Sequence, residues 1–304
     1  MQEIIKTSSV DVNLINFQNE HSTLELIDKC ESSFINQIDD LISDLLSLPE
    51  IKIILLTGPS SSGKTTTANL IASKLTSCNI PSTVISMDDF FIDRDITPIL
   101  EDGTYDFENV NTIDIPLFKS FLKEILQSNK SKMPRFNFVE GKRIGFEEIE
   151  IKENGIIIIE GIHALNPIFI NSHENEIYRV YVSPNTNFTI NNKVVLKPNE
   201  LRRMRRLIRD YFHRGMTVNQ TLELWGNVCL GEEKYIKPFK HTANFWIDST
   251  HNYEPLLYKK YLPPILNDDS ICNEIKNSLK FFSEIEIEFL PNNSLLMEFL
   301  SGLK

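Results

Sequence analysis

The chain has 304 residues, of which 41% are hydrophobic and 24% charged, and it carries a net charge of −11 with an isoelectric point near 5.1. This composition is typical of a globular protein with a sizeable core, and we expect one main domain with terminal extensions. The acidic balance argues against a general partner of nucleic acid or anionic membranes, so an anionic ligand needs a local basic cluster.

Four cysteines lie far apart, without the spacing of a metal site, and we interpret them as reduced thiols. The N-terminus lacks a basic start followed by an apolar stretch, and no apolar run approaches the roughly 18 residues of a membrane helix. We therefore expect a cytoplasmic protein with no membrane segment and no nucleic-acid partner. The sequence leaves open whether the chain forms a homo-oligomer.

The chain begins with a polar, weakly patterned stretch of 22 residues. From Leu24 to Leu48 apolar residues recur at helical spacing, and Pro49 marks the end of this pattern. We interpret the segment as an amphipathic helix that covers one face of a sheet, with a partner-binding helix as the alternative.

A phosphate-binding loop is predicted next. Residues 51–57 are an apolar run that predicts a buried strand, and residues 66–77 predict a helix. The residues between fit the pattern Gly-x-x-x-x-Gly-Lys-Thr, in which backbone N–H groups surround phosphates, the lysine reaches the outer phosphates and the threonine hydroxyl binds magnesium. A structural Gly/Ser turn is the alternative. The residues expected to bind the nucleotide are Gly58, Pro59, Ser60, Ser61, Ser62, Gly63, Lys64, Thr65 and Thr66.

Strands and helices then alternate along the chain. Strands are predicted at residues 83–87, 156–159 and 177–182, and a helix at residues 113–127. The alternation predicts an α/β fold of the P-loop NTPase type, with a parallel sheet and helices on both faces. Residues 133–151 change to short alternating segments, which predict a small β-hairpin insertion.

The last third of the chain is predicted to be mostly helical. We expect a strongly basic helix at residues 199–213, a second helix at 217–230, a strand at 281–290 and a short helix from Ser294.

Carboxylates follow two of the predicted strands. Asp88 comes directly after the strand at 83–87, where it is a candidate general base, and Asp89 is the weaker candidate. Glu160 closes the run of four isoleucines and is a candidate magnesium ligand. Both positions belong to the sheet edge that carries the phosphate loop. The alternative is that they are solvent-facing residues that end a strand.

Five arginines occur within eight residues of the basic helix. Arg202, Arg205 or Arg206, and Arg209 share one helical face. Phosphoryl transfer needs cations around the transferred group, so a lid over the phosphates is the favoured interpretation. A solvated, ion-paired face and an RNA contact are the alternatives.

Several motifs together resemble the uridine kinase and phosphoribulokinase family of P-loop kinases. They are GPSSSGKTT (58–66), SMDDFF (86–91), YDF (105–107), the arginine-rich helix and EGIHALNP (160–167). The chain looks most like bacterial uridine-kinase-like nucleoside kinases, without the synthetase-like N-terminal region that many of these carry, and the resemblance reaches the tail sequence LPNNSLLMEFL (290–300). It implies a helical extension at residues 1–49, a P-loop kinase core at 50–262 and a C-terminal extension at 263–304 that packs on the core.

The resemblance also implies roles for individual residues. Asp88 matches the base that accepts the proton of a sugar 5′-hydroxyl, and Asp106, preceded by Tyr105, matches the ribose-binding aspartate. Phe136 and Phe138 match aromatic positions that flank the nucleobase; without the resemblance they are equally well explained as core residues.

The basic helix matches the family's lid. The implied catalytic cations are Lys64, Arg205, Arg206 and Arg209, and the implied substrate contacts include Arg202 and Arg214. Gly141 stands where uridine–cytidine kinases place a histidine that reads the pyrimidine edge, so the base preference is open. His163 is assigned either to the phosphates or to packing.

We therefore expect an ATP- and Mg²⁺-dependent kinase that phosphorylates the 5′-hydroxyl of a uridine- or cytidine-like nucleoside. Thr65, Asp88 and Glu160 are the expected magnesium ligands. The alternatives are a P-loop kinase of another small hydroxyl substrate, such as a sugar phosphate or a pantothenate-like alcohol, and a non-catalytic regulatory module that binds nucleotide.

Overall fold

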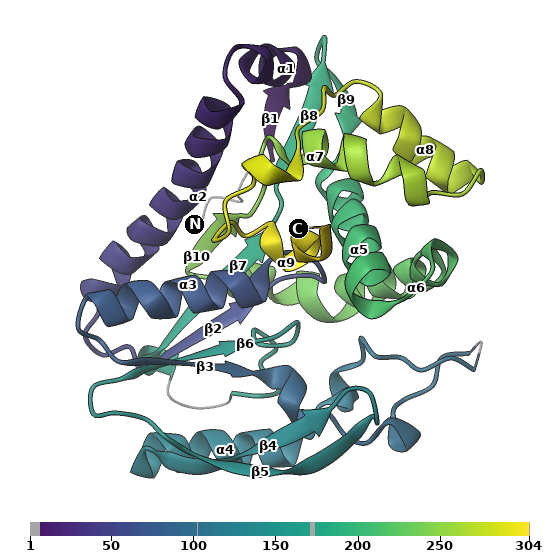
Figure 1. Cartoon of the computed structure of the whole chain (residues 1–304). Helices are drawn as coiled ribbons and strands as arrows, with labels where there is room; N and C mark the ends of the chain where they lie inside the picture. The colour runs from purple at the N-terminus through teal and green to yellow at the C-terminus, as the bar shows by residue number, and fades with distance from the viewer. Residues whose placement is uncertain (1–6, 102, 171–173, 304) are drawn as a thin grey trace.

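The centre of the molecule is a sheet of five parallel strands in the order β10-β7-β2-β6-β3 (Figure 1). The computed structural model describes residues 7–101, 103–170 and 174–303. Because all five strands run the same way, their carboxyl ends form one edge, where ligands of open α/β sheets bind. The strands are β2 (Ile53–Thr57), β3 (Ser82–Ser86), β6 (Ile156–Glu160), β7 (Ile177–Ser183) and β10 (Phe245–Asp248).

The two central strands explain why the sheet is buried on both sides. Every residue of β2 and β6 is buried, as expected for a parallel strand covered on both faces. Alternate side chains of β2 enter two separate hydrophobic clusters, with Ile54 and Leu56 in one and Ile53 and Leu55 in the other. The expected α/β class, with helices on both faces, is confirmed.

Helices also contribute to both clusters. α2, α3 and α5 contribute to the cluster that contains Leu56, and α4 contributes to the other. The helices predicted at residues 24–48, 66–77, 113–127, 199–213 and 217–230 all form. The helices are α1 (Val12–His21), α2 (Thr23–Leu46), α3 (Lys64–Ser77), α4 (Ile115–Ser128), α5 (Pro198–Arg214), α6 (Val218–Gly231), α7 (Glu254–Tyr261), α8 (Ser270–Leu279) and α9 (Met297–Leu300).

Two smaller β structures flank the main sheet. The predicted hairpin insertion forms from β4 (Lys130–Asn137) and β5 (Lys142–Glu150). A three-stranded sheet was not expected: β1 (Ser8–Asp11) runs parallel to β8 (Thr186–Ile190), which pairs with β9 (Lys193–Leu196). The N-terminal stretch interpreted as weakly patterned therefore contains a strand and helix α1.

The strand expected at residues 281–290 does not form, and that prediction was wrong. The segment is an extended connection with a short 3-10 turn at Ile287–Phe289. Its apolar residues Phe282, Ile285 and Leu290 are buried among helices rather than along a strand edge. The backbone N–H of Ile285 donates to the carbonyl of Leu256 in α7, so no neighbouring strand is needed.

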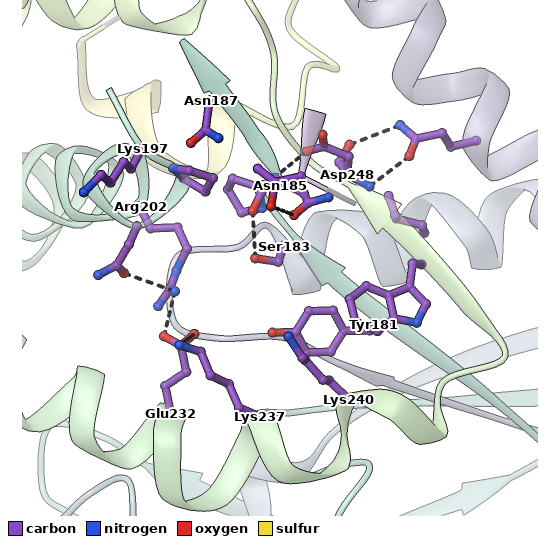
Figure 2. A pocket seen from close by; sticks show the side chains of 17 residues that line it. Tyr181, Ser183, Asn185, Asn187, Lys197, Arg202, Glu232, Lys237, Lys240 and Asp248 are labelled. Carbon is purple, nitrogen blue, oxygen red and sulfur yellow. Dashed lines mark hydrogen bonds and ion pairs between the residues drawn. The ribbon is translucent and has the colours of Figure 1, made fainter. Parts of the chain in front are cut away.

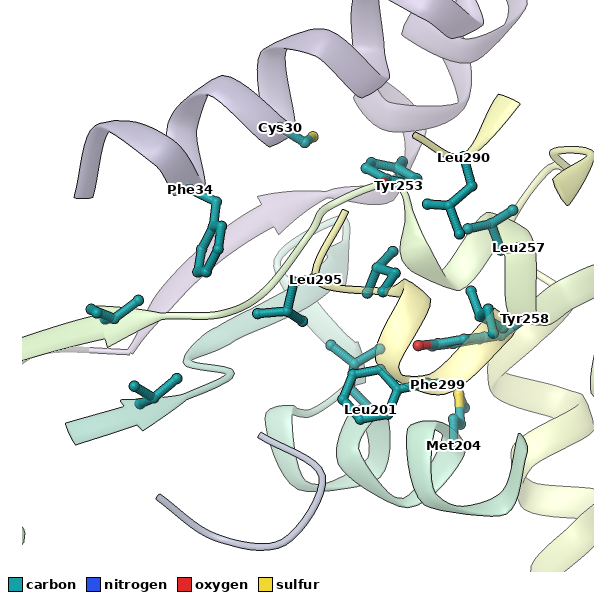
Figure 3. Packing of buried hydrophobic residues seen from close by; sticks show 14 of the residues in the cluster. Cys30, Phe34, Leu201, Met204, Tyr253, Leu257, Tyr258, Leu290, Leu295 and Phe299 are labelled. Carbon is teal, nitrogen blue, oxygen red and sulfur yellow. The ribbon is translucent and has the colours of Figure 1, made fainter. Parts of the chain in front are cut away.

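The C-terminal tail packs against the arginine-rich helix. Figure 3 shows Leu295 and Phe299 of the tail beside Leu201 and Met204 of α5. The proposed core of residues 50–262 therefore shares one hydrophobic cluster with both proposed extensions. In the described part of the chain, no helix has the length and apolar character needed to cross a bilayer.

Candidate active site

The phosphate loop joins β2 to α3, and its backbone shape requires glycine at two points. A Cβ on Gly58 would lie 2.0 Å from the carbonyl oxygen of Val182 in β7, so the loop approaches the neighbouring strand too closely for a side chain. Gly63 has φ +86°, in the left-handed region that favours glycine. Ser61 also has a positive φ of 60°.

The start of α3 leaves several backbone donors free of helical partners. The first helical hydrogen bond runs from the N–H of Thr67 to the carbonyl of Gly63, at 3.0 Å. The N–H groups of Lys64, Thr65 and Thr66 therefore have no acceptor within the helix, which is the arrangement that binds anions at helix N-termini.

Lys64 lies within the phosphate loop, beside the two expected carboxylates. Its Nζ donates to the carbonyl of Pro59 at 3.1 Å, within the loop. Burial lowers the pKa of this ammonium group, and the negative charges of Glu160 and Asp88 oppose that effect. Lys64 thus lies in the electrostatic field of both expected carboxylates.

Asp88 and Glu160 come together at the carboxyl edge of the sheet. β3 and β6 pair in register, with Ser86 opposite Glu160, and Asp88 follows in the 3-10 turn Met87–Phe90. Burial raises the pKa of Asp88, while Lys64 lowers it. Burial and the charge of Asp88 raise the pKa of Glu160 to about 7. Two carboxylates that disfavour each other's ionisation beside a lysine are suited to hold a cation between them.

Glu108 is a third acidic group of the site that the sequence analysis missed. Burial raises its pKa to about 7, while Arg206 and Lys64 favour its ionised form. Its Oε2 is buried and has no hydrogen-bond partner within the described structure. The expected ribose ligand Asp106 lies two residues earlier and instead accepts a hydrogen bond from Asn109 Nδ2 at 3.0 Å. The only sequence signal for Glu108 was its place directly after the YDF motif.

Three arginines of the arginine-rich helix donate hydrogen bonds to the phosphate loop, and the longest runs from Arg205 Nη1 to the carbonyl of Ser61 at 3.5 Å. Arg202 Nε donates to the carbonyl of Ser60 at 3.0 Å, and Arg206 Nη1 donates to Ser60 Oγ at 2.9 Å. Arg202 also pairs with Glu232 at 2.7 Å, beside a cavity of about 480 Å³ whose lining includes Lys237 (Figure 2). Arg202 and Arg206 therefore hold the loop that would hold the phosphates.

Arg205 does not take the catalytic position that its spacing suggested. Its side chain is fully buried and makes a bidentate ion pair with Glu254, with distances of 2.8 and 2.7 Å. Arg205 Nη2 also donates to the carbonyl of Ser249 at 2.7 Å, and the ring of Phe299 lies 5.1 Å from its guanidinium carbon. Apart from a 3.5 Å hydrogen bond from Arg205 Nη1 to the carbonyl of Ser61, all these partners lie outside the phosphate loop. We therefore correct the assignment: the fully buried Arg205 positions the helix against the loop and does not face a phosphate.

The remaining arginines of the helix gather around one aspartate. Asp210 is fully buried and pairs with Arg206 at 3.2 Å, Arg209 at 2.9 Å and Arg214 at 3.4 Å. Arg214 is half exposed, and its charge lowers the pKa of the Asp88 carboxyl. Arg214 is therefore the exposed cation of this group, whereas Arg209 is largely buried and is held by Asp210.

Aromatic residues form a cluster between the hairpin and the turn that carries Asp88. The ring of Phe91 lies 5.8 Å from that of Phe136 and 6.2 Å from that of Phe138. Asp89 fastens the hairpin by accepting from the N–H of Phe136 at 3.4 Å. Phe138 is 53% exposed, so it is free to stack on a planar ligand.

The tip of the hairpin offers no side chain at the expected base-reading position. Gly141 has φ +68°, and a Cβ there would lie 2.7 Å from Nε of Arg94. The guanidinium of Arg94 donates to the carbonyl of Phe138 at 2.6 Å. The side chain of Arg94 thus fills the space beside Gly141 and donates a hydrogen bond to the hairpin backbone.

The two remaining candidates, Tyr105 and His163, have mainly aromatic neighbours. Tyr105 is 40% exposed and contacts Phe107, with ring centroids 5.7 Å apart. His163 is buried between the rings of Phe169 and Tyr235, at 6.4 and 5.9 Å, and burial lowers its pKa to about 4. A neutral, enclosed histidine favours the packing interpretation.

Comparison with known proteins adds an independent line of evidence. The sequence model described as the phosphoribulokinase / uridine kinase family matches residues 53–254. A uridine kinase from Borrelia turicatae is 30% identical over 215 residues, which cover 68% of this chain and 91% of that protein. A uridine kinase from Saccharomyces cerevisiae is 26% identical over 243 residues, covering 76% of this chain and 41% of that protein. A possible uridine kinase from Bacillus stearothermophilus aligns in structure with a TM-score of 0.49 and 17% identity, covering 71% of this chain and 100% of that chain.

Proposed function

Because the chain belongs to the phosphoribulokinase / uridine kinase family, and is therefore an ATP-dependent kinase, we propose that it transfers the γ-phosphate of ATP to the 5′-hydroxyl of a nucleoside. The proposed acceptor is uridine- or cytidine-like. The proposal is supported by one observation above all: Lys64, Asp88 and Glu160 meet at the carboxyl edge of the sheet, directly beside the phosphate loop.

The acceptor end of the site supports a planar ligand attached to a sugar. Phe136 and Phe138 present aromatic faces next to the turn that holds Asp88, and stacking on such faces suits a nucleobase. In this proposal Glu108 or Asp106 accepts hydrogen bonds from the ribose hydroxyls. Glu108 is favoured because its carboxylate interacts electrostatically with both Lys64 and Asp88.

The residues present fit a magnesium ion. Mg²⁺ is usually held by one or two carboxylates together with substrate phosphates, and Glu160 and Asp88 provide such a pair near the exposed Thr65. When bound, the ion would neutralise charge on the outer phosphates. The substrate phosphates would supply further oxygen ligands for such an ion.

In the proposed mechanism Asp88 accepts the proton of the 5′-hydroxyl as the new O–P bond forms and the bond between the γ-phosphorus and the bridging oxygen breaks. Lys64 and the free N–H groups of α3 stabilise the charge that moves to the leaving phosphate. Arg209 and Arg214 supply cations from their ion pairs with Asp210, while Arg202 and Arg206 fix the loop. Catalysis is mainly positioning and electrostatic stabilisation.

A kinase of another small hydroxyl substrate is the second candidate. It is favoured by the hairpin tip, where Arg94 occupies the space beside Gly141 and no side chain reads a base edge.

Replacing Asp88 by Asn tests the assigned base. Turnover should fall by roughly 10²–10⁴-fold, the usual contribution of a general base. The affinity for ATP measured without magnesium should change little, because Lys64 and the N–H groups at the start of α3 bind the phosphates in this proposal. Steady-state rates and calorimetric ATP titration measure the two quantities. Near-normal turnover in this variant would rule out the role given to Asp88.

A further inference from the structure

The C-terminal tail covers the side of the phosphate loop where α3 begins. A Cβ on Gly63 would lie 2.6 Å from Cδ1 of Leu295, so this leucine is in direct contact with the last glycine of the loop. Ser294 Oγ donates to Glu31 of α2 at 2.6 Å. The ring of Phe299 packs on the guanidinium of Arg205. The tail is therefore anchored on both sides of the loop.

A carboxylate of this tail is hydrogen-bonded to the start of α3. Glu298 Oε2 accepts from the backbone N–H of Thr66 at 3.3 Å and from Thr66 Oγ1 at 2.7 Å. Its charge also raises the pKa of Lys64, although less than those of Glu160 and Asp88 do. The carboxylate of Glu298 thus accepts hydrogen bonds from both the backbone N–H and the hydroxyl of Thr66.

The donors that Glu298 uses are those expected to bind a phosphate. The N–H of Thr66 is one of the three at the start of α3 that have no acceptor within the helix. Such first-turn donors, at the positive end of the helix dipole, bind the phosphates nearer the nucleoside in loops of this type. A carboxylate and a phosphate cannot accept from the same N–H at once, and their like charges repel each other.

We propose that Glu298 is a built-in competitor of the donor nucleotide: its carboxylate stands in for a phosphate on Thr66 and must be displaced before the nucleotide binds fully. The inference rests on the proposed function only in taking this loop as the ATP site. It gives the tail a regulatory role, because anything that draws Glu298 away from Thr66 raises the affinity for nucleotide.

The packing indicates how the displacement occurs. Leu296, Phe299 and Leu300 are fully buried, so removing the whole tail would expose a large apolar surface. Glu298 is only partly buried and stands at the surface of the four-residue helix α9. The side chain therefore rotates away while α9 stays in place.

The test is the affinity for ADP, measured by calorimetry without an acceptor nucleoside. Glu298→Ala should bind ADP about tenfold more tightly than the unmodified chain, since one hydrogen bond to a charged group is of that size. Glu288→Ala is the matched control: it removes the same charge from an exposed position of the same tail. Its ADP affinity should stay unchanged. Equal melting temperatures of the two variants would show that the tail remains folded.

Unchanged or weaker ADP binding by Glu298→Ala would overturn the inference, because the carboxylate would then be neutral or helpful to the nucleotide. A similar gain in Glu288→Ala would also overturn it, since the effect would be one of general charge. Failure of the proposed function has a different signature. A chain that binds ADP as predicted yet phosphorylates no nucleoside would contradict the acceptor and leave the role of Glu298 standing.

Discussion

Replacing Glu254 by Gln should strongly destabilise the protein, because it removes the charge that pairs with Arg205. Both Glu254 and its partner Arg205 are fully buried. The carboxylate of Glu254 accepts from Arg205 Nε and Nη2, from the hydroxyl of Tyr258 at 2.9 Å and from the N–H of His251 at 3.0 Å. An amide keeps one acceptor oxygen and turns two donor protons toward groups that are themselves donors.

The size of the effect follows from the buried charge that remains. Removing one partner of a buried ion pair costs about 3–5 kcal/mol, because the other charge stays in a low-dielectric site. In a domain of 150–250 residues each kcal/mol moves the melting temperature by about 2–4 °C, so we expect a drop of about 6–20 °C. Thermal unfolding followed by circular dichroism measures this drop.

Glu286→Gln provides the matched control. Glu286 is ion-paired with Lys260, but it is half exposed, and such surface pairs contribute little to stability. Its melting temperature should stay essentially unchanged. A drop of less than about 2 °C in Glu254→Gln would contradict the assignment of Arg205 as a buried positioning residue, because it would mean that the guanidinium reaches solvent or another anion.

Two further predictions concern the site itself. Glu108 and Glu160 each have a pKa of about 7 in the folded chain, above their ordinary value near 4.5, so the folded state holds protons that the unfolded state releases. Their contribution to stability is present below about pH 4.5 and is lost as the pH rises through 7, so the ligand-free protein should melt at a lower temperature at pH 8 than at pH 5.5. Glu160→Gln should reduce this dependence of the melting temperature on pH. An unchanged dependence in the variant would argue against a buried Glu160. Gly58→Ala should lower ADP affinity at least tenfold and destabilise the chain by about 1–3 kcal/mol, because the added Cβ meets the carbonyl of Val182. The control Gly226→Ala places its Cβ in open space on α6 and should be neutral or slightly stabilising. Equal behaviour of the two variants would refute the close approach of Gly58 to Val182.

The parts of the fold around the candidate site that the sequence predicted are those in which the signal is local. The loop at residues 58–65 carries its own backbone requirements, and its flanking strand and helix are marked by an apolar run and helical spacing. Asp88 and Glu160 follow from the rule that parallel strands end at one edge. These predictions needed no knowledge of distant contacts.

The partners of the individual arginines in the arginine-rich helix could not be predicted from the sequence. Spacing placed Arg205 and Arg206 as alternatives on one face, but only the fold shows that Arg205 meets Glu254 while Arg206 meets Ser60. The partner Glu254 lies 49 residues later, in a segment without a motif of its own. A contact of this kind cannot be derived from helical periodicity.

The loop before α4 and the tail were missed for a similar reason. Asp106 and Glu108 are separated by one residue, and the irregular backbone between them decides which carboxylate turns toward Lys64. The hairpin of β8 and β9 had a signal, since Asn191 and Asn192 both adopt positive φ at its turn, as asparagine tolerates. The tail gave helical and apolar signals but no sign that Glu298 would meet Thr66.

The central claim is phosphate transfer to a nucleoside, and one assay tests it directly. γ-Labelled Mg-ATP is incubated with uridine, cytidine, adenosine, guanosine, inosine or thymidine, beside a control without acceptor, and the labelled products are separated. We predict acceptor-dependent labelling of a nucleoside 5′-monophosphate, with the preferred base showing what the hairpin tip at Gly141 reads. Label that appears only in inorganic phosphate, at the same rate with and without nucleoside, would contradict the account.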